Sequence, residues 1–279
     1  LPNKNKEKEK HMNDNSVFGA HSPSFIGSTI LFFISCGLGR GKIKNFLSSL
    51  WMRFNGTGPV DINYHGINLR IRPFDNTIES RILFSSKFRE KKEIEAIKKH
   101  VNQSTLFLDI GANSGYYSIW VASFGARKVV SFDPNPDMIA RIQENSKINN
   151  FENTIQTSGY ALGDTDDVVT LQIATLEAGL SAITKSIEHD KEIEVRQLTL
   201  QSAMRELSES KPDIIKIDVE GMEDRVLLPY LRNLKPEHFP NLIIIEDNEN
   251  DWEENVVDWL LLNGYRKTDA TRGNLILSR

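Results

Sequence analysis

The feature that most limits how this chain can fold is a regular alternation of short apolar runs and helix-like stretches from residue 105 onward. The apolar runs are rich in β-branched residues and lie at 105–110, 128–133, 154–162, 213–219 and 241–247. Helical spacing occurs at 114–124, 135–149, 201–209, 222–233 and 252–263. Strands that alternate with helices form a parallel sheet covered on both faces. The sequence therefore predicts an α/β fold with a doubly wound sheet, closed in antiparallel fashion by two final strands in 265–279.

Other segments surround this alternating region. Apolar and polar residues alternate around His65-Gly66, which predicts a hairpin over 60–71. Residues 78–101 predict one or two helices, and apolar runs near 168–174 and 192–200 predict a hairpin inserted between the third and fourth strands. We expect three regions, namely a disordered leader at 1–23, a helical segment at 24–59 and the main domain at 60–279. The leader resembles a vector-derived sequence up to His11-Met12, and a natural start at Met12 stays open.

The N-terminal helical segment holds an apolar stretch from Phe25 to Leu38, which is shorter than the roughly 20 residues that a spanning helix needs. We expect a packed helix there, capped by Ser24 and ended by Gly37. Residues 40–54 form a basic amphipathic segment. Such a segment can rest on a membrane surface or cover its own domain, and the second interpretation is favoured.

Composition excludes several classes of protein. Lys and Arg number 34 against 38 Asp and Glu, a net charge of −4, so no basic surplus indicates a nucleic-acid partner. The single cysteine, Cys36, rules out an intrachain disulfide framework and favours a reducing compartment, so we expect a cytoplasmic location. No Cys/His spacing predicts a zinc site, and no pattern indicates an oligomeric state.

A glycine turn follows the first core strand in FLDIGANSGYYS, residues 107–118. The dinucleotide fingerprint needs a central glycine so that the backbone can approach a pyrophosphate. Asn113 occupies that central position between Gly111 and Gly115, and no third glycine follows. This disfavours a nicotinamide-dependent dehydrogenase, which we keep as an alternative.

Two acidic residues suggest what the turn holds instead. Asp109 precedes the turn, where its carboxylate can bind a cationic amino group. Asp133 ends the second core strand, where an acid can bind both hydroxyls of a ribose. A ribose and an ammonium group without a pyrophosphate describe S-adenosylmethionine.

Four motifs in this order resemble the FkbM family of methyltransferases: DIGANSG, SFDPNP, ALGD and IKIDVEGME. The resemblance covers about residues 60–279. It implies a class I methyltransferase fold with a seven-stranded sheet, S-adenosylmethionine as donor, and a hydroxyl acceptor on a sugar, glycan or natural product. The donor contacts it implies are Asp109, Gly111, Asn113 and Gly115 for the methionine part, Asp133 for ribose, and Ala161, Leu162 and Asp164 beside adenine. Asp133 departs from the family, because many relatives carry glutamate there.

Acidic residues after the fourth and fifth core strands are the candidates for removing the acceptor's proton, since an alcohol is a poor acid. Asp218 and Glu220 alternate by two and would point to one side of a continuing strand, with Glu246 opposite them. We predict Glu220 as the general base, with His189 as the next candidate. A Mg²⁺ site built from Glu220, Glu246 and Asp247 stays open, as does a non-catalytic module that only binds the cofactor. Glu223 and Asp224 are expected only to favour the start of the next helix.

Overall fold

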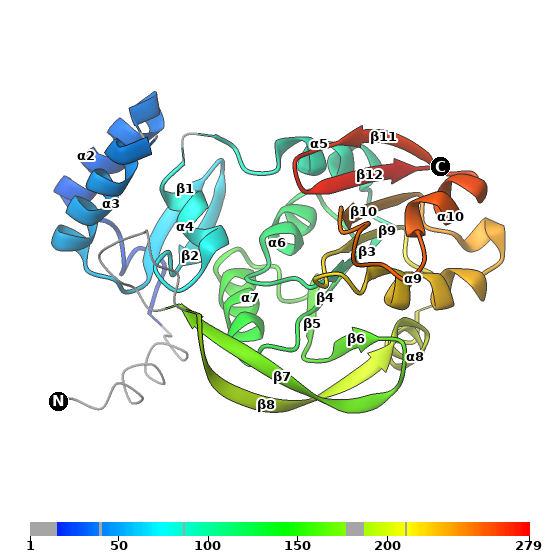
Figure 1. The fold of residues 1–279 in the computed structure, drawn as a ribbon. Helices are drawn as coiled ribbons and strands as arrows, with labels where there is room; N and C mark the ends of the chain where they lie inside the picture. Colours follow the sequence, from blue (N-terminus) through cyan, green and yellow to red (C-terminus); the bar gives the residue numbers. More distant parts are fainter. Residues whose placement is uncertain (1–15, 39–40, 86, 177–186, 210) are drawn as a thin grey trace. The chain divides into compact units, whose positions relative to one another are not determined.

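A computed structural model of the chain describes residues 16–38, 41–85, 87–176, 187–209 and 211–279. The chain divides into two compact units (Figure 1). The first comprises the described part of Leu1–Glu90 together with Gln172–Glu192, and the second comprises Lys91–Leu171 and Ile193–Arg279.

The first unit contains three α-helices and a hairpin. Its elements are α2 (Phe25–Phe33), which runs into a π-helical turn η1 (Ile34–Leu38), α3 (Gly41–Asn55), β1 (Val60–Tyr64), β2 (Ile67–Ile71) and α4 (Thr77–Leu83). The side chain of Ser24 accepts a hydrogen bond from the Gly27 amide at 3.1 Å, and Gly37 has φ 101°. The cap at Ser24 and the hairpin about His65-Gly66 are thus confirmed, whereas the α-helix ends at Phe33, before the π-helical turn that contains Gly37. None of the helices described is both long and apolar enough to cross a membrane.

Residues 17–21, which fall within the leader expected at 1–23, are held by the hairpin. Asp61 and Arg70 form a buried ion pair at 2.7 Å. The Asp61 carboxylate also accepts hydrogen bonds from the amides of Gly19 and His21, at 2.7 and 3.1 Å. Arg70 donates to the carbonyl of Val17 at 3.1 Å. The hairpin therefore belongs to the first unit, whereas the predicted main domain began at residue 60.

The second unit is built on a seven-stranded sheet. Its order is β11 (Arg266–Ala270), β12 (Asn274–Ser278), β10 (Leu242–Glu246), β9 (Ile214–Ile217), β3 (Leu106–Ile110), β4 (Lys128–Phe132) and β5 (Ile155–Ser158). The neighbours from β10 to β5 pair in parallel, and β12 is antiparallel to both β10 and β11. The predicted mostly parallel sheet with an antiparallel last strand is confirmed.

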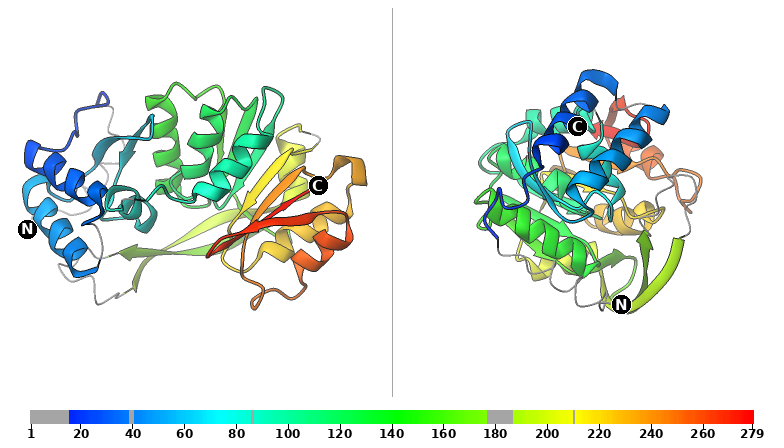
Figure 2. Two further views of the ribbon diagram at one scale, coloured as in Figure 1. Left: turned by 90° about the horizontal axis from the view of Figure 1, so that it is seen from above. Right: turned by 90° about the vertical axis from the view of Figure 1, so that its left-hand side faces the viewer.

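Helices cover both faces of this sheet, as Figure 2 shows. One layer holds α5 (Lys91–His100), α6 (Tyr116–Ser123) and α7 (Pro136–Ile148). The other holds α8 (Leu200–Glu206), α9 (Glu223–Arg232) and α10 (Val256–Leu262), and a 3-10 turn η2 (Pro236–His238) follows α9. Side chains of Asn135, Thr199 and Asn255 cap α7, α8 and α10. The central strands are buried on both faces, which explains their continuous apolar runs.

The third apolar run, 154–162, forms two strands rather than the predicted one. After β5 the chain enters β6 (Ala161–Gly163), which pairs in parallel with β8 (Ile187–Thr199) in a second sheet with β7 (Asp167–Leu176). The physical reason lies in the neighbouring strand. β4 ends at Phe132, and the Asp133 amide makes the last bond to β5 by donating to the carbonyl of Ser158 at 3.1 Å, so β5 has no partner in this sheet beyond Ser158.

Candidate active site

The candidate site lies at the carboxyl ends of β3, β4, β9 and β10. From β3 the chain continues outward on one side through β4 and β5, whereas β9 and β10 extend the sheet on the other side. The strand order therefore reverses between β3 and β9. Ligands of doubly wound sheets bind beside such a reversal, outside the carboxyl ends of the strands.

The glycine turn after β3 is pressed against the end of β9. Gly111 has φ 72°, and a Cβ atom there would lie 1.9 Å from the backbone oxygen of Asp218. Gly115 has φ 82°, and its Cβ would lie 2.8 Å from a side-chain carbon of Ile142. Both positions combine a left-handed backbone with a close approach, so only glycine fits. The structure thus brings Gly111 and Asp218 together.

Asp109 is buried within the sheet on the side of α6. One carboxylate oxygen accepts hydrogen bonds from the amide and hydroxyl of Ser118, at 3.0 and 2.5 Å, and the Ser118 hydroxyl also contacts that of Ser131 at 2.7 Å. The other oxygen, Oδ1, is buried without a hydrogen-bond partner in the described structure. Burial raises the pKa of Asp109, while the charge of Lys216 opposes that shift. An unpaired buried acceptor of this kind suits a cationic donor from a ligand.

Asp133 joins the two turns that follow β3 and β4. Its oxygens accept hydrogen bonds from the amides of Asn113 and Asn135, at 2.8 and 2.9 Å. Asn113 has φ 50°, which turns its amide toward the carboxylate. Burial raises the pKa of Asp133 to about 6, although both amide hydrogen bonds oppose the shift. Asn113 and Asp133, which were predicted to bind different parts of the donor, are therefore in direct contact.

Lys216 is a charged residue of this site that sequence reasoning missed. It lies beside Asp109 in the register of β3 and β9, and its side chain is only 4% exposed. Its ammonium group contacts the Asp218 carboxylate at 2.8 Å and lies 5.4 Å from the centre of the Tyr117 ring. The sequence could have indicated it, since Lys216 lies within the apolar strand IIKI. A lysine is costly to bury unless it is paired, so its presence there predicts an acidic partner nearby.

Asp218 and Glu246 approach each other from the ends of neighbouring strands. The Asp218 carboxyl acts on that of Glu246 through a side-chain hydrogen bond. Burial, this bond and the charge of Asp218 raise the pKa of Glu246 to about 7. The side-chain amide of Asn248 donates to Glu246 at 2.7 Å and opposes the shift. Two of the three predicted catalytic acids thus form a pair.

Glu220 reaches this region by a different route from the one predicted. The strand ends at Ile217, and Glu220 and Gly221 both have positive φ, 54° and 94°, so the chain turns instead of continuing in extended form. The premise that Asp218 and Glu220 alternate along one strand is therefore wrong. Partial removal from water and the charges of Asp218 and Glu223 still raise the pKa of Glu220, so its carboxyl lies among the other acids.

Glu223 holds the loops after β9 and β10 together. It is fully buried at the start of α9, as expected for a helix N-terminus. It also accepts hydrogen bonds from the amides of Val219 and Gly221, at 2.9 and 3.3 Å, and from the indole of Trp252 at 2.7 Å. Its neighbour Asp224 accepts from two amides of the later loop. Both acids therefore support the loops that carry Glu220 and Glu246.

The residues predicted to border adenine lie in the second sheet. Ala161 and Leu162 pair with Gln197 and Leu198 of β8, and Leu162 is part of the core. Asp164 is exposed in the turn before β7. Their contact with a donor stays a prediction. Asp247 is also exposed, next to Glu246, and the side chain of His189 lies outside the described residues.

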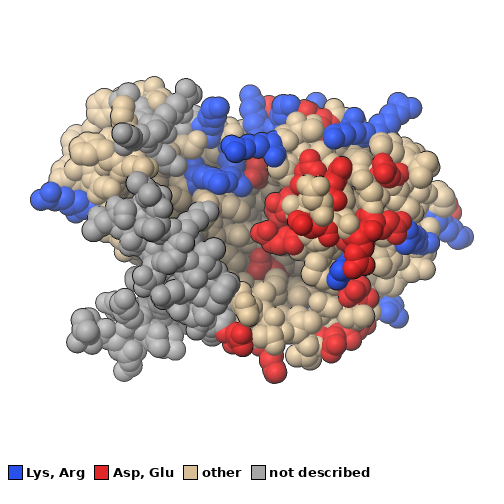
Figure 3. Space-filling view, viewed as in Figure 1, with Lys and Arg blue, Asp and Glu red and all other residues tan. Residues whose placement is uncertain are grey.

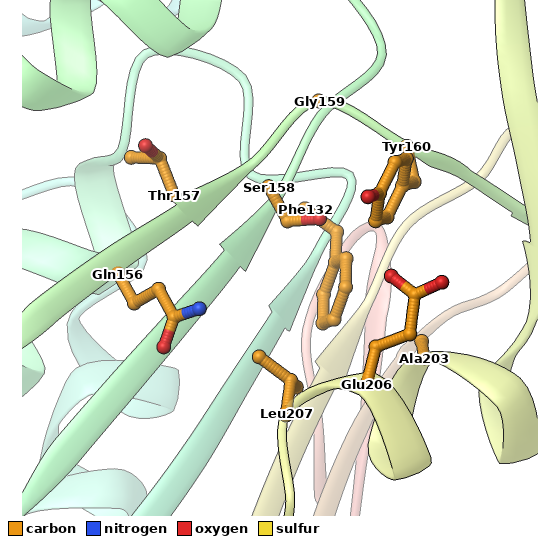
Figure 4. Close-up of a pocket in the computed structure, with 9 residues that line it drawn as sticks. All are labelled: Phe132, Gln156, Thr157, Ser158, Gly159, Tyr160, Ala203, Glu206 and Leu207. Carbon is orange, nitrogen blue, oxygen red and sulfur yellow. The ribbon is translucent and has the colours of Figure 1, made fainter.

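A separate cavity of about 270 Å³ opens on the opposite face of the sheet from Asp109 (Figure 4). The ring of Phe132 points toward Leu207 of the chain after α8, and the carboxylate of Glu206 points toward Tyr160. Phe132 alternates with Ser131, which contacts Ser118 of α6, so the cavity lies on the α8 side.

Acidic side chains gather on the face where α9, β10 and α10 lie (Figure 3). The sequence at this edge is rich in acids, with Glu246 at the end of β10 and five more in the loop that follows, namely Asp247, Glu249, Asp251, Glu253 and Glu254. Such a surface repels anionic groups and favours neutral or cationic ligands.

The sheet order, the turn without a pyrophosphate fingerprint and the acids at the strand ends define a class I methyltransferase fold. Residues 109–267 match the family described as the Methyltransferase FkbM domain. The chain belongs to this family. These residues form an S-adenosylmethionine-dependent methyltransferase domain, and the alternative of a nicotinamide dehydrogenase is wrong.

Two curated proteins are similar to parts of this chain. The chain is 24% identical to a hexuronic acid methyltransferase of Haloferax volcanii over 157 residues, which are 56% of this chain and 62% of that protein. It is 29% identical to the ribosomal protein L11 methyltransferase of Alkaliphilus oremlandii over 89 residues, 32% of this chain and 28% of that one. The chain thus spans less than two thirds of the length of either relative.

Two solved methyltransferase structures illustrate the similarity in fold. One is the tRNA (uracil-54, C5)-methyltransferase of Pyrococcus abyssi in complex with S-adenosyl-L-homocysteine, with TM-score 0.45, 13% identity, and coverage of 79% of this chain and 43% of that one. The other is a ribosomal protein L11 methylase of Lactobacillus delbrueckii, with TM-score 0.42, 15% identity, and coverage of 69% and 80%.

Proposed function

We propose that this chain transfers the methyl group of S-adenosylmethionine to a hydroxyl of a sugar, glycan or natural product. The observation that carries the proposal is the cluster of Asp218, Glu220 and Glu246 beside the glycine turn. A carboxylate with a raised pKa is a stronger base than usual, and an acceptor alcohol needs a base nearby. The sugar is supported by the hexuronic acid methyltransferase of Haloferax volcanii, to which the chain is similar.

The donor fits the residues present. The unpaired Oδ1 of Asp109 would accept a hydrogen bond from the donor's ammonium group, and Asp133 would bind the ribose hydroxyls. Gly111, Asn113 and Gly115 would let the backbone approach the methionine part. When bound, S-adenosylmethionine supplies an electrophilic methyl group on its sulfonium.

In the proposed reaction Glu220 would take the proton of the acceptor hydroxyl, which would make that oxygen a nucleophile toward the methyl group that the bound donor supplies. Asp218 and Glu246 would orient the hydroxyl through hydrogen bonds. An acceptor carboxylate at this place would be repelled by three acids, so an ether product is favoured over a methyl ester. The acidic surface likewise argues against a nucleic-acid acceptor, whose phosphates need basic contacts. A cytoplasmic location remains a prediction from the single cysteine.

Two alternatives are kept as outcomes of the test. Mg²⁺ bound by Glu220, Glu246 and Asp247 could replace the base, although no set of three His, Cys, Asp or Glu arranged to hold a metal occurs among the described residues. The other alternative is a module that binds the donor without transferring its methyl group.

The experiment supplies methyl-labelled S-adenosylmethionine with a panel of uronic-acid-containing and neutral oligosaccharides, and it detects alkali-stable label. We expect Glu220→Gln to lower turnover by ~10² or more, with donor affinity within a few-fold. Glu249→Gln, an exposed acid of the neighbouring loop, is the matched control and should keep full turnover.

Other results would redirect the proposal. Loss of activity with a chelator and recovery with Mg²⁺ would make Glu220 a metal ligand. Full turnover in Glu220→Gln without any metal would exclude both roles. Alkali-labile label would indicate an ester, and donor binding without transfer to any acceptor would favour the non-catalytic module.

A further inference from the structure

The outward face of α2 is apolar along its whole length. Phe25 is 88% exposed and Phe32 63%, and Ile26 and Phe33 of the same face are also exposed. Two polar residues of α2, Ser28 and Thr29, are exposed as well, and Thr29 donates its hydroxyl to the carbonyl of Phe25 at 2.9 Å. Four large apolar side chains are nevertheless exposed on one short helix, and such a patch is typical of an interaction surface.

The neighbouring helix α3 extends this face. The two helices are locked together, because the Ser24 amide donates to the side chain of Asn55 at 2.8 Å, and a Cβ on Gly27 would overlap the same side chain. On α3, Ile43, Phe46 and Phe54 are exposed.

The packing of α3 leaves these exposed residues without a role in the first unit. Its other side buries Trp51 fully against Phe74 and Phe84, with ring centres 5.9 and 5.7 Å apart. Through Trp51, α3 covers the first unit, in keeping with the predicted role of residues 40–54. The apolar face formed by Phe25, Ile26, Phe32, Phe33, Ile43, Phe46 and Phe54 is called the aromatic face below.

The segment that contains α2 and α3 is positively charged, whereas the whole chain is negatively charged. Residues 16–59 contain no Asp or Glu and four basic residues, at 40, 42, 44 and 53, whereas the whole chain has a net charge of −4. Arg53 is exposed beside Phe54. The surface of α2 and α3 is mostly tan in Figure 3 and shows no acidic side chain. Aromatic and aliphatic side chains combined with an excess of positive charge match the composition of helices that lie in a membrane interface.

We propose that the aromatic face binds the surface of an anionic lipid bilayer, with α2 and α3 lying in the plane of the interface. The helices have 9 and 15 residues, too few to span the hydrocarbon core of about 30 Å. Phe25, Phe32 and Phe46 would enter the boundary between head groups and acyl chains, and the exposed Arg53 would contact anionic head groups. The proposal is independent of the acceptor chosen by the methyltransferase domain.

The test measures co-sedimentation of the full chain with vesicles of phosphatidylcholine alone or with 30% phosphatidylserine, a composition chosen on the order of that of anionic leaflets. We expect binding to the anionic vesicles that weakens at high salt, because exposed charges are screened. The triple variant Phe25→Ser, Phe32→Ser, Phe46→Ser should lower the partition coefficient by about tenfold or more. Leu262→Ser, which removes an 87% exposed leucine from α10, is the control and should bind as the parent does.

The fluorescence of Trp51, measured in a background in which Trp120, Trp252 and Trp259 are replaced by Phe, and the melting curve of each variant verify that the first unit stays folded. Absence of vesicle binding overturns the proposal, as does binding that the triple variant retains. Concentration-dependent dimerisation in solution, lost in the triple variant and without vesicle binding, would assign the aromatic face to a second copy of the chain instead.

Discussion

Replacing Gly111 by alanine tests the contact on which the candidate site depends. Two costs add up at this position. Its φ of 72° is a left-handed conformation that costs a residue with a Cβ about 1–2 kcal/mol. The new Cβ would also lie 1.9 Å from the backbone oxygen of Asp218, an atom that cannot rotate away as a side chain can. Overpacking of this kind adds about 1–3 kcal/mol, so we expect a total loss of roughly 2–5 kcal/mol.

Gly125→Ala separates the two costs. Gly125 has φ 88°, and a Cβ there would meet nothing within 4 Å. This control lies in the same unit and should lose only about 1–2 kcal/mol from the backbone conformation. Urea denaturation of both variants measures the difference, and calorimetry with S-adenosylmethionine measures donor affinity.

We expect Gly111→Ala to weaken donor binding by about tenfold or more, because the turn and the end of β9 must move apart. Gly125→Ala should leave donor binding unchanged. Equal stability of the two variants, or donor binding in Gly111→Ala equal to that of the parent, would refute the reasoning that the turn is fixed by this close approach.

Two further perturbations test the acids of the site. Asp133→Ala should weaken donor affinity by about 1.5–3 kcal/mol per hydrogen bond lost, and it should also destabilise the turns that hold Asn113 and Asn135. The control Asp137→Ala, at an exposed position, should do neither. Unchanged donor affinity in Asp133→Ala would remove Asp133 from the donor site. Glu246 has a folded pKa of about 7 against an ordinary value of 4.5, so the folded state binds more protons between these values and stability falls as pH rises through that window. Urea denaturation at pH 5 and pH 7.5 measures how much the free energy of unfolding falls between the two, and this fall should be smaller in Glu246→Gln than in the parent. An identical fall in both proteins would show that Glu246 does not titrate as described.

The local features of the sequence predicted most of the secondary structure of the second unit. Periodicity, caps and turn glycines act within a few residues, so the order of strands and helices, the start of α2 at Ser24 and the positions of Gly111 and Gly115 could be derived from the sequence. Asp109, Asp133, Asp218 and Glu246 could be placed at strand ends for the same reason.

The tertiary structure decided which distant segments meet. Lys216 lies beside Asp109 only because β3 and β9 are neighbours in the sheet, although more than a hundred residues separate them in the chain. The break between β5 and β6 depended on where β4 ends, and the turn at Glu220 on hydrogen bonds from its loop to Glu223. Burial, shifted pKa values and exposed apolar faces are properties of such contacts between segments. Sequence patterns predict each segment by itself, whereas packing determines its neighbours and, through them, the chemistry of its side chains.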